Sequence, residues 1–335
     1  MKILITGGAG FIGSNLCEYF LQNHQVICLD NFSTGYRHNI ESFLLNSSFE
    51  LIEGDIRNIE TCRKAVQNVD YVFHQAALGS VPRSIDDPIT TNSVNIDGFL
   101  NMLVAARDAG VKRFIYAASS STYGDSKELP KVEENIGKPL SPYAITKYVN
   151  ELYAQIFTNL YGIETIGLRY FNVFGKRQNP NGSYAAVIPL FIKCLIKHER
   201  PIINGDGSYS RDFTYIDNVI QANELAMVTS TNIILERLNT NENSPKITQI
   251  NIIINVASGG KTTLNELFTS LRSNLSCYDP IIADIKPIYG IERLGDIPHS
   301  QASIEKAKNI LSYQPKCNTS QGLEFVCKWY FENLK

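Results

Sequence analysis

The sequence predicts an α/β protein: a Rossmann-type doubly wound parallel sheet with a smaller C-terminal α/β region that binds substrate. Short apolar segments such as residues 3–5 recur with helical segments between them, as in strands buried on both faces of a parallel sheet. The first segment leads directly into a glycine-rich stretch and then a helical pattern. We expect residues 1–172 to form the nucleotide-binding domain, with later segments returning to it, and residues 173–335 to form mainly the substrate-binding region.

Composition narrows the class of protein. The 335 residues have a formal net charge of −2, and without a basic excess we expect no nucleic-acid partner. No apolar run is long enough for a membrane span, and too few residues precede the first glycine for a secretion signal. The seven cysteines are scattered, without a Cys/His cluster at metal-ligand spacing. We therefore expect reduced thiols, no metal site, no membrane partner and a cytoplasmic location.

The first strand and glycine turn predict a dinucleotide site. Glycines at positions 7, 10 and 13 let the backbone turn tightly and approach a pyrophosphate at the start of the following helix. Residues 25–30 predict a second strand ending in Asp30, whose carboxylate suits ribose hydroxyls and repels a 2′-phosphate. This pattern favours NAD over NADP. A strand-end aspartate that only caps a loop is the alternative, and Arg37 could soften the exclusion of NADP.

The third and fourth strands are expected at residues 49–53 and 69–74. Asp55 and Ile56 follow the third strand, where they could flank an adenine, and small residues after the fourth leave room for a cofactor. We interpret His74 as a packed strand residue. A helix is expected over residues 88–109; its Asn95 either contacts the cofactor or fixes a neighbouring loop.

The fifth strand, residues 111–118, delivers Ser119, Ser120 and Ser121 at its end, where hydroxyls can meet a substrate alcohol. The alternative is a turn that satisfies its own backbone. Ser141 is expected to cap the next helix, in which Tyr143 and Lys147 lie one turn apart. An ammonium there, with the helix N-terminus and a cationic cofactor, should lower the phenol pKa and make a base. An ordinary exposed helix face is the alternative.

The C-terminal half alternates less regularly. A sixth strand is expected at 163–169, a helix at 186–198, a strand from 202, and a capping box at 263–266. Thr319 is expected to cap a last helix at 322–334, and residues 231–248 are interpreted as a polar loop. Arg211 and Arg293 are cations suited to a second phosphate group, although single arginines commonly form surface ion pairs.

Taken together, the glycine turn, Asp30, the run from Ser119 to Gly124 and the Tyr143-x-x-x-Lys147 pair resemble the extended short-chain dehydrogenase/reductases, in the NAD-dependent epimerase/dehydratase branch. The resemblance covers residues 1 to about 307. Residues 168–175 and 211–213 and the Arg293-x-Gly-Asp motif are similar to UDP-hexose 4-epimerases. Residues 117–124 with 178–182 look most like bacterial UDP-N-acetylglucosamine 4-epimerases of polysaccharide (O-antigen) synthesis. Dehydratase relatives carry an Asp-Glu pair where Ser120 and Ser121 stand, which argues against elimination of water.

This resemblance implies a mechanism. Tyr143, as phenolate, removes the proton of the sugar 4-hydroxyl while C4 gives hydride to NAD+, and Lys147 holds the ribose. The 4-keto sugar then swings about its pyrophosphate linkage and takes hydride back on the opposite face. Relatives pair helices into a dimer, here around residues 92–109 and 143–161, so a homodimer is expected.

The expected site residues combine the motifs with the resemblance. The catalytic set is Ser119, Ser120, Ser121, Tyr143 and Lys147. The cofactor set is Gly7, Gly10, Phe11, Ile12, Gly13, Asp30, Asn31, Ser33, Thr34, Gly35, Asp55, Ile56, Gln75, Ala76, Ala77, Asn95, Tyr143, Lys147 and Tyr170. The substrate set, for a UDP-sugar, is Gly79, Ser80, Ser119, Ser121, Tyr143, Asn172, Val187, Ile203, Asn204, Arg211, Arg293, Asp296 and Ser300.

Ser300 carries the substrate prediction. In the epimerases restricted to UDP-glucose and UDP-galactose, the resemblance places a bulky tyrosine at this position, facing the sugar 2-substituent, and a lysine at the position of Gly79. Small residues here predict UDP-GlcNAc/UDP-GalNAc interconversion, unless Ser300 is only a turn residue near a surface helix. The alternatives are another UDP-sugar 4-epimerase, acting on UDP-Glc/UDP-Gal or a UDP-uronate, and a catalytically idle NAD-sensing binding protein.

Overall fold

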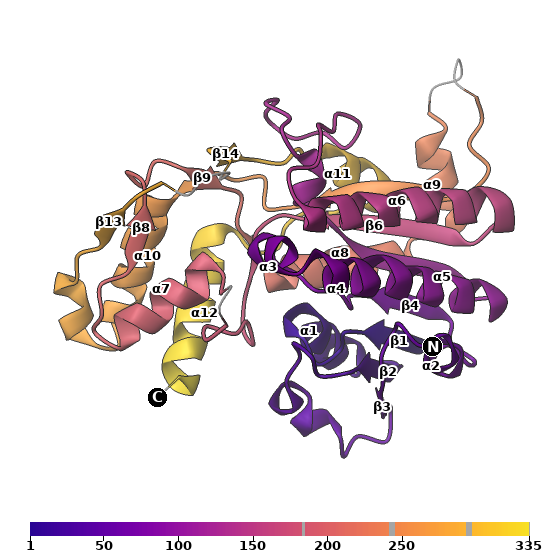
Figure 1. Cartoon of the computed structure of the whole chain (residues 1–335), viewed down its shortest axis with the longest axis horizontal. Helices are drawn as coiled ribbons and strands as arrows, with labels where there is room; N and C mark the ends of the chain where they lie inside the picture. Colours follow the sequence, from indigo (N-terminus) through magenta and orange to yellow (C-terminus); the bar gives the residue numbers. More distant parts are fainter. Residues whose placement is uncertain (183–184, 241–244, 293–296, 335) are drawn as a thin grey trace.

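The larger of the two lobes is built around a parallel β-sheet (Figure 1). The computed structural model describes residues 1–182, 185–240, 245–292 and 297–334, and within them this sheet has seven strands in the order β11-β6-β5-β4-β1-β2-β3. All neighbouring strands pair in parallel. Their bounds are β1 Lys2–Thr6, β2 Gln25–Asp30, β3 Phe49–Glu53, β4 Tyr71–His74, β5 Arg113–Ser119, β6 Glu164–Tyr170 and β11 Asn251–Val256. The predicted doubly wound fold is confirmed.

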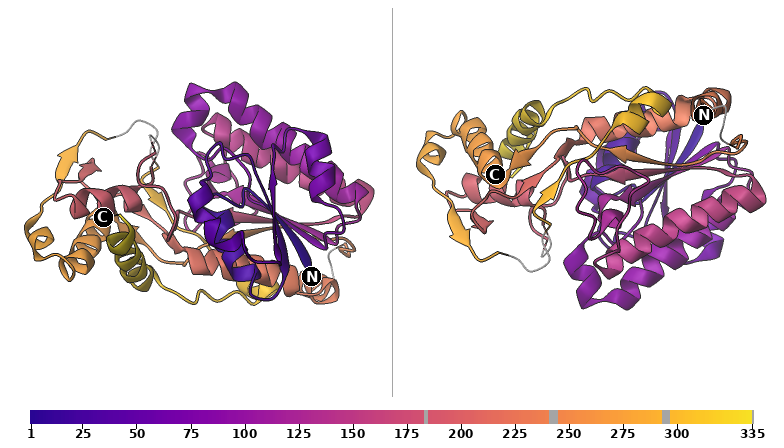
Figure 2. Two further views of the ribbon diagram at one scale, coloured as in Figure 1. Left: turned by 90° about the horizontal axis from the view of Figure 1, so that it is seen from below. Right: turned by 90° about the horizontal axis from the view of Figure 1, so that it is seen from above.

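Helices cover both faces of the sheet because side chains of each buried strand alternate between two cores. In β1, Ile3 and Ile5 belong to one core and Leu4 to the other. The core around Leu4 is covered by α2 Ile59–Ala65, α5 Gly98–Asp108 and α6 Pro142–Tyr161, with α3 Val81–Asp86 and α4 Pro88–Asn92 packed on α6. The opposite core is covered by α1 Phe11–Phe20 and α8 Ile216–Val228. Figure 2 shows the sheet between these layers.

Strand order reverses beside β1. The chain runs outward from β1 through β2 to β3, then returns to the other side of β1 with β4. The loops that follow β1 and β4 therefore diverge at the carboxyl edge of the sheet, which is where open α/β sheets form a ligand crevice.

The smaller lobe lies at the left of Figure 1 and contains α7 Val187–Ile196, α10 Leu264–Ser276 and α12 Thr319–Asn333. Short strands complete it or join it to the sheet lobe: β7 Val173–Phe174, β8 Ile202–Asn204, β9 Ser210–Arg211, β10 Thr214–Tyr215, β12 Thr262–Thr263, β13 Ile288–Gly290 and β14 His299–Ser300. The chain crosses between lobes more than once after residue 172, because α8, β11, α9 and α11 Glu305–Leu311 pack in the sheet lobe. None of the described helices combines the length and apolar character that crossing a bilayer requires.

Local signals placed several elements correctly. Ser141 caps α6 as predicted, its Oγ accepting from the Ala144 amide at 3.1 Å, and Pro142 opens the helix. The capping box between Thr263 and Glu266 at the start of α10 is also present. The predicted strands of the sheet lobe agree with the observed ones to within two residues, the usual uncertainty at strand ends.

Two predicted boundaries are wrong. Residues 231–248 are not all loop, because Thr231–Leu238 forms α9, capped by Ser230 and anchored by fully buried Ile234. Thr319 does not cap α12; Asn318 does, in a capping box with Gln321. The predicted helix at 88–109 is confirmed in its bounds, since α4 begins at Pro88 and α5 ends at Asp108, but a π-helical turn over Ser93–Asp97 joins the two.

A buried ion pair fixes α6 against the sheet. The Arg169 guanidinium of β6 donates to both carboxylate oxygens of Glu151 in α6, at 2.9 and 2.8 Å, and both side chains are almost fully buried. Arg169 also donates to the Glu133 carbonyl at 2.9 Å and lies 4.8 Å from the Tyr123 ring centroid. Bidentate geometry orients as well as attracts, so this pair sets how α6 lies on the sheet.

Candidate functional site

A cavity of about 460 Å³ lies along the carboxyl edge of the sheet. Most of the predicted cofactor residues line it: Gly7, Gly10, Phe11, Ile12, Gly13, Asp30, Asn31, Ser33, Thr34, Asp55, Ile56, Gln75, Ala76 and Ala77. Gly79, predicted for the substrate, also lines it. Gly7 and Gly79, 72 positions apart in the sequence, therefore line one cavity, because parallel strands end at one edge.

The glycine turn leaves room where side chains would block it. Gly7 has a positive φ of 68°, and a Cβ on Gly13 would lie 2.1 Å from the Gly7 carbonyl oxygen. Gly10 precedes α1 without a side-chain cap, so the first amides of this helix have no side-chain acceptor there. A helix N-terminus of this kind suits a phosphate group.

Asp30 closes the wall beside the turn. Its Oδ2 accepts from the Ala9 amide at 2.9 Å and its Oδ1 from the Phe32 amide at 2.8 Å. Burial raises the pKa of this carboxyl, and the two amides oppose the rise. Arg37, considered above as a cation for a 2′-phosphate, pairs with Glu53 and lies 4.6 Å from the Phe32 ring centroid. The arrangement retains the preference for NAD.

Asp55 and Asn31 form the outer part of the same wall. Asn31 Nδ2 donates to Asp55 Oδ2 at 2.9 Å, and Arg57 pairs with this carboxylate at 2.7 Å. The ion pair lowers the pKa of Asp55 to about 2, so its charge persists at neutral pH. The outer wall therefore offers fixed acceptors.

One buried polar atom in the wall lacks a partner. The Nε2 atom of Gln75 is buried without a hydrogen-bond partner among the described residues, whereas its Oε1 accepts from the Tyr170 hydroxyl at 3.3 Å. A buried donor of this kind carries an energetic cost unless a ligand accepts from it. With the glycine turn and Asp30, it makes the cavity wall a suitable fit for a dinucleotide.

Five predicted cofactor residues lie outside the cavity lining: Gly35, Asn95 and Tyr170, and Tyr143 and Lys147, which are described below. The amide of Asn95 is instead bonded to the Leu78 amide at 2.8 Å, the Leu78 carbonyl at 3.2 Å and Thr146 Oγ1 at 3.1 Å. The structure thus corrects its role to holding the loop after β4, the alternative considered above. Tyr170 reaches the wall only through Gln75. Gly35 lets the backbone pass close to Asp30, since a Cβ at position 35 would lie 3.0 Å from Asp30 Oδ1.

Ser119, Tyr143 and Lys147 come together beyond this cavity. The side chain of Ser119, at the end of β5, forms a hydrogen bond with the Tyr143 phenol. Ser121 donates to Ser119 Oγ through its amide at 3.1 Å and its hydroxyl at 2.9 Å, so the serine run also satisfies its own backbone. Ser120 begins a 3-10 turn that covers Ser120–Tyr123. Ser119 is the member of the run next to the phenol.

In the protein without ligand, the pKa of Tyr143 is raised rather than lowered. Burial raises this pKa, and the hydrogen bond from Ser119 only partly opposes it. Lys147 Nζ donates to the Ala117 carbonyl at 2.8 Å and lies 6.0 Å from the Tyr143 ring centroid. Burial lowers the pKa of Lys147 to about 8. Loss of hydration therefore outweighs the attraction of the ammonium for a phenolate.

His74 is the packed residue that the sequence predicts. Its Nδ1 lies 3.0 Å from Thr6 Oγ1, and its ring stacks on Phe114. Burial, with the positive charge of Lys147, lowers its pKa to about 3, so it stays neutral.

The structure describes some of the substrate residues that were predicted after residue 171. Asn172 has a positive φ of 37° and donates from Nδ2 to the Asp212 carbonyl at 3.1 Å. Ser300 lies in β14, paired with Arg211 of β9, and is not a turn residue near a surface helix. Val187 begins α7, Ile203 is fully buried in β8, and Asn204 ends β8. Arg293 and Asp296 lie outside the described residues.

The edge of the cavity near α3 is open. A Cβ added at Gly79 would meet nothing within 4 Å, whereas Ser80 has an unusual φ of 125° and caps α3. A serine with positive φ is strained backbone, which functional sites often retain. Gly79 therefore leaves open space in the cavity wall.

Several lining residues were not predicted as site residues: Leu29, Tyr36, Gly54, Leu78, Arg83, Val94, Gln178, Asn179, Gly182, Ala185 and Ala186. Residues 178–182 carried a signal, since they were part of the family resemblance. Tyr36 and Arg83 had none, because the loop after β2 and helix α3 reach the cavity only through the tertiary fold.

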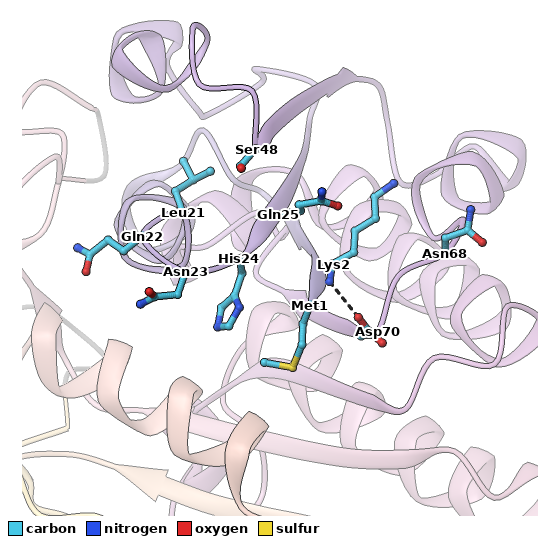
Figure 3. A pocket seen from close by; sticks show the side chains of 10 residues that line it. All are labelled: Met1, Lys2, Leu21, Gln22, Asn23, His24, Gln25, Ser48, Asn68 and Asp70. Carbon is cyan, nitrogen blue, oxygen red and sulfur yellow. Dashed lines mark hydrogen bonds between the residues drawn. The ribbon is translucent and has the colours of Figure 1, made fainter.

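A second hollow lies at the opposite end of the strands (Figure 3). It is lined mainly by polar side chains around Met1 and His24, and the Lys2 amide donates to Asp70 Oδ2 at 2.9 Å. It lies at the amino ends of β1 and β2, away from the switch point. Among the described residues, no group of three or more His, Cys, Asp or Glu side chains is placed to hold a metal.

Comparison with known proteins agrees with this site. The model of the NAD dependent epimerase/dehydratase family matches residues 3–239. The chain belongs to this family. It is therefore an NAD-dependent enzyme, and the predicted family and cofactor are confirmed.

Individual relatives cover the chain along its length. A putative UDP-glucose 4-epimerase of Methanocaldococcus jannaschii is 36% identical and spans 99% of both chains. The solved UDP-N-acetylglucosamine 4-epimerase of Methanobrevibacter ruminantium, in complex with UDP-N-acetylmuramic acid, has a TM-score of 0.87 at 36% identity and spans 99% of this chain and 98% of its own. UDP-glucuronic acid 4-epimerase of Bacillus cereus, solved with UDP-glucuronic acid and NAD, has a TM-score of 0.85 at 30% identity and spans both chains fully.

We expect Asp30→Ala to weaken NAD binding and to narrow the preference for NAD over NADP, because the carboxylate both accepts hydrogen bonds and repels a 2′-phosphate. Equilibrium titrations with NADH and NADPH, followed by fluorescence, measure this. Asp30→Asn is the matched control, since it retains an acceptor and removes only the charge. Equal affinity of the unaltered protein for NADH and NADPH would contradict the assignment.

Proposed function

We propose that this enzyme is a UDP-N-acetylhexosamine 4-epimerase that interconverts UDP-GlcNAc and UDP-GalNAc for polysaccharide precursor synthesis. The observation that carries epimerisation is the Ser119–Tyr143 hydrogen bond with Lys147 beside it, at the carboxyl edge of the sheet along which the cavity proposed for NAD lies. Relatives that are UDP-sugar 4-epimerases along the whole chain support the reaction class. All seven cysteines are free thiols, which is typical of a cytoplasmic protein.

The chain supplies the proton chemistry. In our proposal Tyr143 takes the proton of the sugar 4-hydroxyl and later returns it, and Ser119 orients that hydroxyl. Bound NAD supplies a reversible hydride acceptor at the sugar carbon. Lys147 donates to the Ala117 carbonyl, which fixes its ammonium one helical turn from the phenol. Thr146 ties the same turn to Asn95, so the base sits on a supported helix start.

Room beside the sugar supports the N-acetylated substrate. Ser300 is small and paired with Arg211, which we propose binds the UDP diphosphate, and the space beyond Gly79 is open. An N-acetyl group adds three heavy atoms to the 2-substituent, and a bulky wall residue excludes added atoms at a cost of about 1–3 kcal/mol or more. The Methanobrevibacter enzyme was solved with an N-acetylated sugar nucleotide, which agrees with this choice.

One observation favours a second candidate, a UDP-uronate. Arg83 lines the cavity near Gly79, and its guanidinium is a cation that a C6 carboxylate could meet. The Bacillus cereus relative acts on UDP-glucuronic acid. We keep the N-acetylated substrate as the proposal because Ser300 and Gly79 are small and uncharged. They leave room for an N-acetyl group but cannot pair with a carboxylate.

We also propose a homodimer. Apolar side chains are exposed along α6 at Ile145, Leu152, Ile156 and Leu160, and Ile89 on the adjacent α4 is 81% exposed. A stripe at this spacing suits pairing with a second copy. Light scattering of the purified protein tests this: a dimer mass is expected, and a monomer at high micromolar concentration would refute it.

The substrate test compares sugars and a single substitution. We expect the unaltered enzyme to convert UDP-GlcNAc with higher kcat/KM than UDP-Glc or UDP-GlcA, with NMR identifying each product. Ser300→Tyr should reduce kcat/KM for the UDP-GlcNAc/UDP-GalNAc pair by about 5- to 150-fold and leave that for UDP-Glc/UDP-Gal comparatively intact, since about 1–3 kcal/mol of overlap acts only on the larger sugar.

Tyr143→Phe is the inactive control for both sugars. If Ser300→Tyr lowers kcat/KM equally for both substrate pairs, Ser300 does not determine which sugar is preferred. Preference for UDP-GlcA would establish the uronate candidate instead. Absence of turnover on every UDP-sugar, with NAD bound, would indicate the idle NAD-binding protein.

A further inference from the structure

Two loops from distant parts of the chain meet at the cavity. Tyr36 follows β2 and Asn179 follows β7, 143 positions later, and both line the cavity. The Asn179 side-chain amide donates a hydrogen bond to the Tyr36 hydroxyl. We propose that this Tyr36–Asn179 bridge is a clasp over the cofactor that slows NAD dissociation.

The Tyr36 arm is fixed to the glycine turn itself. The Tyr36 amide donates to the Ala9 carbonyl at 3.0 Å, and Asn39 Nδ2 donates to the same carbonyl at 2.9 Å. Ala9 also donates its amide to Asp30. This arm therefore holds its position relative to the part of the wall that receives the pyrophosphate.

The Asn179 arm is fixed to α1, which follows that turn. Glu18 of α1 pairs with Lys176 and, at 3.0 and 3.1 Å, with Arg177, and Asn15 Nδ2 donates to the Lys176 carbonyl at 3.1 Å. The two cations lower the pKa of Glu18 against its partial burial, so the pairing persists at neutral pH.

The tip of this arm is oriented by its own turn. Asn179 Oδ1 accepts from the Asn181 amide at 2.8 Å, which leaves the amide nitrogen to face Tyr36. Tyr36 is exposed to solvent, with 40% of its surface accessible. Two firmly anchored arms thus meet through a single exposed side-chain hydrogen bond, which can open while the arms stay in place.

Retention suits the chemistry. Epimerisation has no net redox change, so NAD ends each cycle in its starting state and need not leave. The benefit of retaining NAD rests on the proposed function, whereas the clasp itself is tested by cofactor release without any sugar. Failure of one is therefore distinguishable from failure of the other.

The experiment measures the release rate of NADH. Protein loaded with NADH is mixed with excess NAD, and the fluorescence decay gives the dissociation rate for the unaltered protein, Tyr36→Phe, Asn179→Ala and the double variant. Each single variant should release NADH about fivefold faster, which corresponds to about 1 kcal/mol for one hydrogen bond. The double variant should match the singles, because both remove the same interaction.

Two further variants sharpen the test. Glu18→Gln, outside the cavity lining, should also speed release because it loosens the Asn179 arm. Tyr278→Phe is the matched control, a tyrosine of similar exposure in the smaller lobe, and should leave the rate unchanged. Unchanged release in either single variant would overturn the clasp. Additive effects of the two substitutions would overturn it as well, since they would show independent contacts.

Discussion

The convergence of parallel strands at one edge of a sheet is the constraint on which this enzyme depends. Because β1, β2, β4, β5 and β6 all run in the same direction, their following loops meet, and each loop contributes a different group. The glycine turn, Asp30, Gln75 and Ser119 come from four separate strand ends. No local segment holds the site, so the sheet has to form before the site exists.

Buried polar contacts then fix the helix that carries the proposed base. The Arg169–Glu151 pair holds the middle of α6 to β6, and Asn95 holds its first turn through Thr146. Asn95 also bonds both backbone groups of Leu78, in the cavity wall. The π turn at Ser93–Asp97 is the irregular segment that carries this asparagine, which agrees with the frequent occurrence of such turns near functional sites. The Asn95 side chain thus connects the helix turn that carries the proposed base to the cavity wall.

The sequence predicted these parts unequally, for physical reasons. Strands β1 and β2 and the start of α6 carry local signals: apolar runs, a glycine turn, and Ser141 before Pro142. Helix α9 was missed although Ser230 caps it and Ile234 is buried in the core, because its residues were interpreted together with the polar, Asn-rich stretch that follows them. Tyr36 and Asn179 were missed as a pair because their contact spans 143 positions. Features that depend on neighbouring residues could be predicted from the sequence, whereas contacts between distant segments could not.

The pKa of Tyr143 shows the same limit and leads to the most direct test. The sequence predicted a phenol activated by Lys147, the helix N-terminus and a cationic cofactor. Burial dominates in the protein without ligand, so the positive cofactor has to complete the base. Tyrosinate absorbance, taken as the difference between the unaltered protein and Tyr143→Phe, should be measured against pH with and without NAD. The account predicts no ionisation of Tyr143 below about pH 10 without NAD, and ionisation at clearly lower pH with NAD bound. A phenolate near neutral pH without NAD, or a titration that NAD leaves unchanged, would contradict it.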